Sequence, residues 1–297
     1  LTRPLVRTPA ELIAETTLPR NRISTMWETA ETAKSVSDRQ AETRGWYYIQ
    51  GYEPWLYHRS DQAREREAAS SSYELGLRMV AKTDFLKTIV EKNHIATVEK
   101  ICPGIDRDIF YPGEQQAHSG SPRLSALYQP AIPWRGTDLL LQTLEELFVR
   151  NSNLEVFLFG SSDIEHCPPA LRKRIHFLGK LPASKVAELY RSSDVVCDLS
   201  LMHGFGRMGI EALACGAVPV LSESGGVAEY ARHDENALIV PDKPDLIARS
   251  LNTLLQDSVY RLQLRQNGLD TFSWSEAQAT SDWLQLLEHD SGSKQAA

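Results

Sequence analysis

The chain has 297 residues, of which 42% are hydrophobic and 24% are charged, and its 39 acidic residues outnumber 32 basic ones for a net charge of -7. This composition is typical of a soluble globular protein, and the length allows two domains. The negative charge argues against a nucleic-acid-binding protein, which usually carries a basic face.

Residues 1–112 alternate short apolar runs with polar segments. Strands are predicted at 22–27, 46–50, 77–82 and 99–104, and helices at 61–75 and 83–93. These are too few strands for a complete Rossmann-like domain, so we expect the N-terminal domain to be incomplete. The Pro- and Gly-rich segment 103–122 separates this region from the next, and we place the domain boundary between residues 112 and 113.

Residues 113–272 alternate six apolar, β-branched runs with amphipathic ones. Strands are predicted at 124–129, 154–160, 175–179, 194–201, 217–223 and 236–240, and helices at 137–150, 169–173, 184–193, 207–215 and 226–232. Strands joined by helices predict a doubly wound parallel sheet, which binds its ligands beyond the carboxyl ends of the strands. Thr137 and Ser184 are predicted N-caps. Helices at 245–257 and 259–272 complete this domain, and a helix and tail are predicted at 273–297.

Neither a membrane span nor a metal site is predicted. The four cysteines lie far apart and form no C-x-x-C pair. Asp106, Arg107 and Asp108 form a D-x-D sequence, but it falls in the interdomain linker. No apolar run approaches the roughly 18 residues of a membrane span, and residues 1–15 lack the apolar core of a signal peptide. We therefore expect a cytoplasmic protein.

The glycine-rich stretch 204–209, GFGRMG, fits the dinucleotide-binding pattern G-x-G-x-x-G. Free N–H groups at the start of the following helix would attract an anion, and the glycines would let a phosphate approach. Glu223 stands near the position of the acidic residue in NAD-binding proteins. However, the motif follows the fourth strand of the domain rather than the first, and Glu211 in the first helical turn would repel a pyrophosphate while suiting ribose hydroxyls. An NAD-dependent dehydrogenase is therefore the less favoured alternative.

The segment SLMHGFGRMGIEALACGAVPVLSESGG, with the strand that follows it, resembles the donor-binding core of retaining GT-B glycosyltransferases of family 4. FLGKLPASKVAELYRSSDVVCDLS is similar to the family's base-binding segment, and FSWSEAQATSDWLQLL to its closing helix, which packs back on the first domain. The resemblance implies an α/β fold with two Rossmann-like domains facing a cleft. It also implies transfer from a nucleoside-diphosphate sugar with retention at the anomeric carbon, and neither a cofactor nor a metal.

The same resemblance assigns site residues. Glu211 would bind the ribose hydroxyls, and Arg135 would match the Lys that neutralises the leaving diphosphate. His203 stands where the family has a Glu that contacts the donor sugar, and Lys180 lies near the expected base pocket. The backbone at the start of the helix would meet the diphosphate or the sugar through four residues, namely Gly204, Phe205, Gly206 and Arg207.

Two departures from the family pattern leave a second alternative open. His203 replaces an acidic residue, and the family's Arg near the first strand falls on Gln129 or Pro130, which removes one cation. Loss of a cation should weaken stabilisation of the leaving group. A non-catalytic nucleotide- or glycan-binding relative would carry the same changes.

The first part of the chain resembles rhamnan-synthesis rhamnosyltransferases, through STMWETAETAKS, GWYYIQGYEPWLY and PGIDRDIFYPG. This implies transfer of a hexosyl unit, rhamnosyl in particular, to a glycan or lipid-linked glycan in surface polysaccharide synthesis. A peripheral contact with the inner face of the membrane would suit that acceptor. On the acceptor side we expect Tyr52 and Trp55 to face the cleft, and His58 is the candidate general base.

Overall fold

The computed structural model describes residues 21–39, 43–113, 120–271 and 274–292. It divides into two compact units, one made of Leu1–Cys102 with Ala279–Ala297 and the other of Pro103–Gln278. The division at 102/103 lies ten residues before the predicted boundary. The physical reason is that Ile105 and Phe110, in the segment read as a linker, are buried in the core of the second unit.

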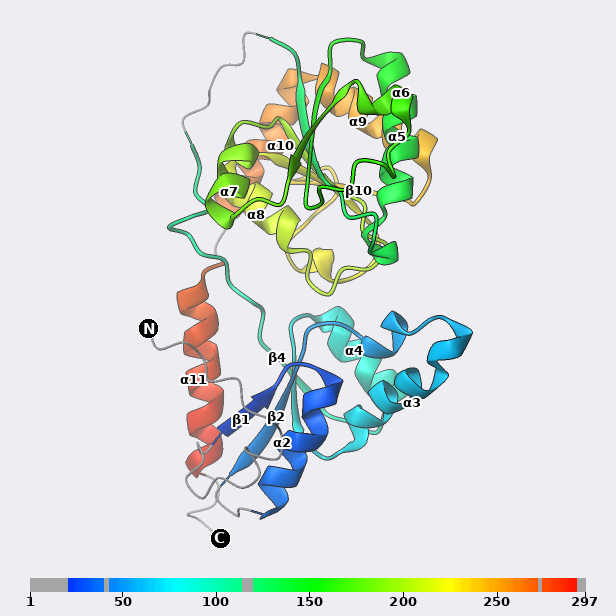
Figure 1. The fold of residues 1–297 in the computed structure, drawn as a ribbon. Helices are drawn as coiled ribbons and strands as arrows, with labels where there is room; N and C mark the ends of the chain where they lie inside the picture. Colours follow the sequence, from blue (N-terminus) through cyan, green and yellow to red (C-terminus); the bar gives the residue numbers. More distant parts are fainter. Residues whose placement is uncertain (1–20, 40–42, 114–119, 272–273, 293–297) are drawn as a thin grey trace. The chain divides into compact units, whose positions relative to one another are not determined.

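The first unit contains a parallel four-stranded sheet in the order β1-β2-β3-β4 (Figure 1). Its strands are β1 (Asn21–Ser24), β2 (Arg44–Ile49), β3 (Arg78–Ala81) and β4 (Val98–Lys100), and its helices are α2 (Trp27–Arg39), α3 (Ala63–Ser71) and α4 (Asp84–Asn93). Short 3-10 helices lie at Glu53–Leu56 (η1), Ser60–Gln62 (η2) and Ser72–Glu74 (η3). The predicted strand at 22–27 ends early because α2 begins at Trp27. Helix α2 is absent from the predicted elements because its buried residues, Ala30, Ala33 and Val36, give a weak apolar pattern.

The two faces of this sheet are covered differently. One face packs through Tyr47, Ile49 and Met79 in a core that includes residues of α2 and α4. The other face packs against α11 (Glu276–Gly292), where the ring of Trp283 lies 6.5 Å from that of Trp46. The C-terminal helix therefore supplies part of the core of the first unit.

The second unit contains a parallel six-stranded sheet in the order β10-β9-β8-β5-β6-β7. All six predicted strands are present: β5 (Arg123–Leu127), β6 (Glu155–Phe159), β7 (Ile175–Gly179), β8 (Val195–Asp198), β9 (Val218–Ser222) and β10 (Leu238–Val240). This is the order of a doubly wound Rossmann-like sheet, whose strand order reverses between β5 and β8. The carboxyl ends of β5 and β8 are therefore the place to look for a ligand site.

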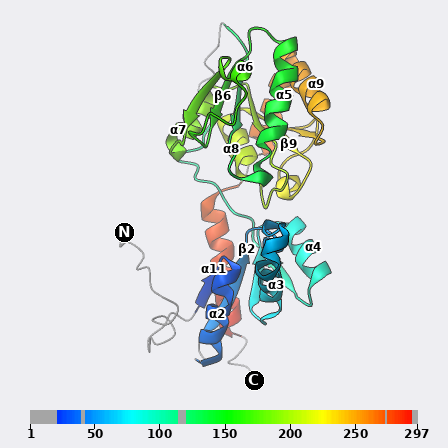
Figure 2. The same cartoon turned by 45° about the vertical axis from the view of Figure 1, so that its right-hand side comes forward.

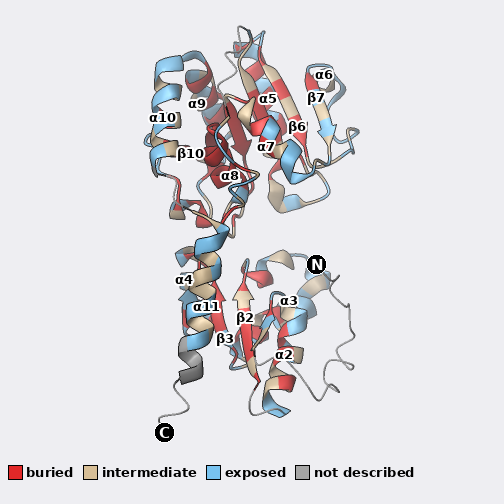
Figure 3. Ribbon diagram, turned by 90° about the vertical axis from the view of Figure 1, so that its left-hand side faces the viewer, coloured by how far each residue is buried: buried red, intermediate tan, exposed pale blue. Residues whose placement is uncertain are grey.

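Helices cover both faces of this sheet (Figures 1 and 2). They are α5 (Thr137–Arg150), α6 (Pro169–Arg172), α7 (Ala183–Arg191), α8 (Arg207–Cys215), α9 (Pro244–Gln256) and α10 (Ser258–Thr271), with 3-10 helices η4 (Pro133–Arg135) and η5 (Gly226–Glu229). Leucines of α5 and α9 belong to one core and residues of α7 and α8 to another. Helix α8 is buried from Met208 to Cys215 (Figure 3).

The predicted N-caps are wrong. Helix α5 begins at Thr137 after Gly136, and α7 begins at Ala183 after Pro182, so Thr137 and Ser184 lie inside their helices. The Thr137 hydroxyl instead accepts a hydrogen bond of 3.1 Å from the Gln129 N–H. It thereby ties the loop after β5 to the start of α5.

Candidate functional site

The loops that follow β5 and β8 pack against each other at the point where the strand order reverses. The Leu201 N–H donates to the Trp134 carbonyl at 2.8 Å. Gly136 has a φ of 64°, and a Cβ at this position would overlap the Leu199 carbonyl. The glycine is needed both for its backbone conformation and for this close approach. The contact brings the loop carrying Arg135 beside the loop that leads to the glycine-rich stretch.

Two of the three glycines of the pattern, Gly206 and Gly209, pack against Tyr230. Gly206 precedes α8 with a φ of 81°, and its carbonyl accepts a hydrogen bond of 2.5 Å from the Tyr230 hydroxyl. A Cβ at Gly206 or Gly209 would meet that hydroxyl. The Phe205 side chain is buried, with its ring centroid 5.4 Å from that of Tyr230. Of the predicted contacts in this stretch, Phe205 can therefore offer only its backbone.

Glu211 is a buried carboxylate close to the start of α8. It stands in the second turn, not in the first as predicted, since the helix begins at Arg207. Only 9% of the residue is exposed. Burial raises the pKa of Glu211, and Arg207, whose Nε donates to Oε1 at 3.1 Å, opposes that rise. The side chain of Arg207 is therefore directed to the carboxylate, and only its backbone is at the helix start.

Two polar atoms in the loop after β5 lack partners. In the part of the chain that the structure describes, neither Nε of Arg135 nor Oε1 of Gln129 has a hydrogen-bond partner, although both atoms are buried. Unsatisfied buried polar atoms are rare because desolvation is costly. Arg135 was predicted as a site residue. Nothing in the sequence predicts the unpaired oxygen of Gln129. The sequence shows only that the family's cation is missing at Gln129 or Pro130.

His203 is turned into the protein. Its imidazole is 1% exposed, with Nε2 3.1 Å from the Ser222 hydroxyl and Nδ1 3.8 Å from Oδ2 of Asp198. Because the ring is buried in this conformation, it could contact a donor sugar only if the loop rearranged. The sugar contact stays a prediction. Asp198 and Ser222 were missed by sequence reasoning. The available signal was an acidic residue at the end of the apolar run DVVC.

Lys180 is exposed and follows β7, the edge strand of the sheet. Strands β5 and β6 lie between β7 and β8, so the fold does not place Lys180 beside the glycine-rich stretch. Its role near a base pocket stays a prediction. The D-x-D carboxylate of Asp106 accepts a hydrogen bond from the Asp108 N–H at 2.9 Å, which is a local turn contact.

The residues expected on the acceptor side differ in how far they are exposed to solvent. Tyr52 is buried, stacks on Tyr73 with ring centroids 5.6 Å apart, and forms a 2.9 Å hydrogen bond with Nε2 of His94. It therefore belongs to the core of the first unit. Trp55 is 45% exposed and meets Tyr52 edge-on at 5.1 Å, and His58 is exposed.

The short helix that carries Trp55 is anchored by a buried carboxylate that the sequence did not single out. Glu53 accepts hydrogen bonds of 2.8 Å from the Trp27 N–H and 2.9 Å from the Tyr47 hydroxyl. These bonds fix η1 to the first residue of α2. Trp55 is therefore an exposed ring on a rigid support at the carboxyl end of β2.

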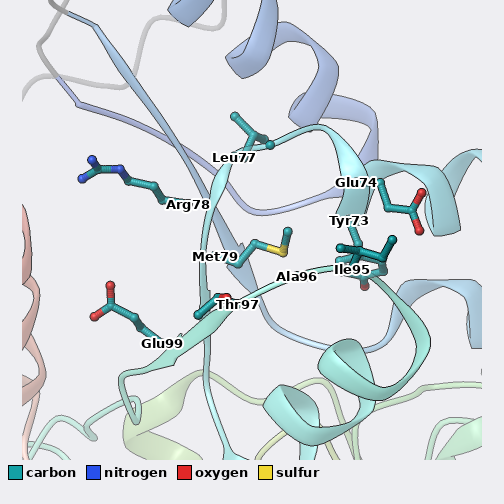
Figure 4. A pocket seen from close by; sticks show the side chains of 10 residues that line it. Tyr73, Glu74, Leu77, Arg78, Met79, Ile95, Ala96, Thr97 and Glu99 are labelled. Atoms are coloured by element: carbon teal, nitrogen blue, oxygen red, sulfur yellow. The ribbon is translucent and has the colours of Figure 1, made fainter.

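A pocket of about 420 Å³ lies elsewhere in the first unit, beside the amino ends of β3 and β4 (Figure 4). Its lining includes Leu77, Met79 and Ile95, with Arg78 and Glu99. Open parallel sheets bind ligands at the opposite end of their strands. We assign the pocket no part in the site.

The described ranges contain neither a cluster of metal-binding side chains nor a membrane-spanning helix. Among these residues, no three His, Cys, Asp or Glu side chains gather in a way that could hold a metal ion. No helix within the same ranges has the length and apolar character needed to cross a membrane.

Comparison with known proteins identifies the family. The family described as "Glycosyl transferases group 1" matches residues 114–271. A glycosyltransferase of Methanocaldococcus jannaschii is 28% identical over 151 residues, which are 47% of this chain and 38% of that protein. The O-antigen biosynthesis protein RfbC of Myxococcus xanthus is 25% identical over 264 residues, which are 88% of this chain and 20% of that protein. The chain thus spans well under half the length of these relatives.

Solved structures show the fold. Anabaena HepE, in complex with UDP and glucose, superposes with a TM-score of 0.79 at 16% identity, covering 95% of this chain and 81% of that one. With its two parallel-sheet Rossmann-like domains, this fold is of the GT-B type. Because the family match covers more than half of the 297 residues, the chain belongs to the group 1 glycosyl transferases.

Proposed function

We propose that this chain transfers a hexosyl unit from a nucleoside-diphosphate sugar to a glycan acceptor, with retention at the anomeric carbon and without a metal ion. One observation carries the proposal. Where the strand order of the second sheet reverses, the N-terminus of α8, the buried carboxylate of Glu211 and the unsatisfied Nε of Arg135 occur together. These groups suit a diphosphate attached to a ribose.

The chemistry divides among these groups. Backbone N–H groups at the start of α8 and the Arg135 guanidinium would stabilise the negative charge on the departing diphosphate. Glu211 would accept hydrogen bonds from the ribose hydroxyls. The bond from the anomeric carbon to the diphosphate oxygen breaks as the acceptor oxygen bonds to that carbon. The hydroxyl proton of the acceptor passes to an oxygen of the leaving phosphate on the same face.

The absence of a metal is part of the same proposal. A transferase that uses no metal must neutralise the diphosphate with its own positive charge. Arg135 and the dipole of the nine-residue helix α8 supply such charge at one end of the sheet.

On the acceptor side, Trp55 offers an exposed aromatic face at the carboxyl end of β2, which suits stacking on a sugar ring. The O-antigen biosynthesis protein matches 88% of this chain, which supports a role in surface polysaccharide synthesis. A rhamnosyl donor and a lipid-linked acceptor at the inner face of the membrane follow from the resemblance of residues 25–113. His58 is the alternative group to take the acceptor's proton, in place of the leaving phosphate.

Nucleotide binding tests the proposal against the dehydrogenase alternative. Ligand-observed NMR without divalent metal would screen dTDP, UDP, GDP and NAD against the wild type, Glu211→Ala and Glu223→Ala. We expect one nucleoside diphosphate to bind the wild type and Glu223→Ala but not Glu211→Ala. Binding of NAD alone, lost in Glu223→Ala, would contradict the donor-site proposal and favour the dehydrogenase.

A non-catalytic relative is the second candidate, because the position of the family's cation falls on Gln129 or Pro130 and the His203 ring is buried. Such a relative would bind a nucleoside diphosphate as tightly as an active transferase does. It would not release the nucleotide from its sugar ester. Turnover of the ester therefore separates the two candidates.

A further inference from the structure

Four polar side chains form a buried network behind the glycine-rich stretch. Asp198, Ser200, His203 and Ser222 are each no more than 3% exposed. Asp198 ends β8 and Ser222 ends β9, so the network sits at the carboxyl ends of two neighbouring strands. Burying a charged carboxylate is costly, and the proposed transfer chemistry does not use this one.

The network fixes where the imidazole of His203 carries its proton. The Ser222 hydroxyl donates its one hydrogen to the Ser200 carbonyl. It can therefore only accept from Nε2 of His203, which lies 3.1 Å away. Nε2 must be protonated, and Nδ1 is the atom that can gain or lose a proton.

Nδ1 faces the carboxylate of Asp198, whose Oδ2 could accept a hydrogen bond from a protonated Nδ1. Oδ2 of Asp198 lies 3.8 Å from Nδ1, too far for a hydrogen bond. The other oxygen, Oδ1, already accepts from the N–H and the hydroxyl of Ser200 at 3.1 and 2.5 Å. A neutral ring thus turns a lone pair toward Asp198, whereas a protonated ring would make an ion pair.

The charges around the ring come from three elements. Burial lowers the pKa of His203. Asp198 raises it, Arg135 on the facing loop lowers it, and Asp242 after β10 raises it. Burial raises the pKa of Asp242, as does the neighbouring carboxylate of Glu223, and His203 lowers it. Since burial dominates, we expect a neutral ring at neutral pH without ligand.

We propose, on the basis of the proposed function, that binding of a sugar nucleotide at the glycine-rich stretch is coupled to uptake of one proton by the His203–Asp198 pair. The phosphates would offset the positive charge of Arg135 and add negative charge nearby. A proton from solvent then bonds to Nδ1, which donates to Oδ2 of Asp198.

The ion pair would stiffen the loop that holds the ligand. The His203 N–H donates to the Ser224 carbonyl at 3.2 Å, and its carbonyl accepts from the Gly226 N–H at 2.8 Å. A Cβ at Gly225 would overlap the His203 backbone between these bonds. Fixing the ring therefore fixes the backbone directly before the glycine-rich stretch.

Calorimetry in several buffers counts the protons. UDP-glucose, dTDP-rhamnose and GDP-rhamnose would each be titrated into the full chain at pH 6.5, in buffers of different ionisation enthalpy. Sugar esters are chosen because, unlike free UDP, they have no phosphate that titrates near neutrality. If the ligand returns the imidazole to its ordinary pKa, about half a proton is taken up per bound ligand.

Two variants and one spectrum make the test specific. Asp198→Asn keeps an oxygen for the Ser200 contacts, and His203→Gln removes the titrating ring. Asp198→Asn should still bind the ester, and the heat of binding to either variant should not depend on the buffer. The ¹⁵N spectrum of the histidine ring should show a neutral, Nε2-protonated form without ligand, and this measurement does not depend on either variant folding.

The outcomes separate this proposal from the proposed function. Equal heats of wild-type binding in all buffers would overturn the proton uptake and leave the sugar-nucleotide site standing. A ligand-free ring that is already doubly protonated, or protonated on Nδ1, would overturn it too. If none of the three esters binds, both proposals fall.

Discussion

Glu211 is kept in a buried site where its charge costs stability. Its pKa is raised in the folded protein, so the native state binds more protons than the unfolded state between pH 4.5 and the folded pKa. The free energy of unfolding therefore falls as pH rises through that window. A carboxylate retained despite this cost points to a ligand-binding role rather than a stabilising one.

Glu211→Gln should therefore bind nucleotide poorly without losing stability. It removes the buried charge and gives up only an ion pair with Arg207, whose side chain is half-exposed, worth about 1 kcal/mol or less. Loss of charged hydrogen bonds to a ribose should weaken binding about tenfold or more. Thermal unfolding at pH 7 and nucleotide titration measure both effects. A destabilised variant with normal affinity would mean that Glu211 is structural.

Tyr52 and Trp55 should separate stability from function in the first unit. Tyr52→Phe leaves Nε2 of His94 without its partner and should cost about 1–3 kcal/mol of unfolding free energy. Trp55→Ala removes a half-exposed ring and should cost less, while reducing transfer to a glycan acceptor. Urea unfolding and transfer assays on both variants test this. The acceptor role fails if Trp55→Ala transfers sugar normally.

At the scale of elements, the third glycine of the motif, Gly209, is explained by its close packing against Tyr230 and Leu221, which lie outside its helix. Gly209 lies within α8, where alanine is normally better by about 1 kcal/mol. Here a Cβ would collide with the Tyr230 hydroxyl and with Leu221. Gly209→Ala should therefore destabilise the protein.

Adding Tyr230→Phe should recover part of that loss, because it removes the hydroxyl from the contact. The double mutant should be more stable than the sum of the two single changes allows, by more than about 0.5 kcal/mol. Chemical denaturation of all four proteins measures the coupling. Simple additivity would show that the Tyr230 contact does not explain the glycine.

The sequence was sufficient for the six strands of the second sheet because their apolar runs are continuous and are separated by clear helical segments. It failed for α2, whose buried side is made of alanines and one valine, and for the starts of α5 and α7, where Gly136 and Pro182 precede the helix. Arg135 was assigned from the resemblance to family 4 glycosyltransferases, and Glu211 both from that resemblance and from its place near the start of a helix. The inward His203, its partner Asp198 and the orphaned Gln129 oxygen depend on contacts between loops, which no local pattern records.

At the scale of the whole molecule, the proposed sugar-nucleotide site belongs to one unit. Its loops, Arg135 and Glu211 all lie within Pro103–Gln278, as does the family match at 114–271. Changes in the first unit should therefore alter transfer to the acceptor more than they alter nucleotide affinity. Trp55→Ala, measured for both properties, tests this division.

The most direct test of the central claim is ³¹P NMR of nucleotide release from UDP-glucose, dTDP-rhamnose and GDP-rhamnose, with water as acceptor. We predict release by the wild type and by the exposed-cation control Lys173→Ala. Arg135→Ala should slow release about 100-fold or more, because it removes charge stabilisation of the leaving group. If no ester is turned over, or if Arg135→Ala turns one over at the wild-type rate, this site is not the catalytic centre of a glycosyltransferase.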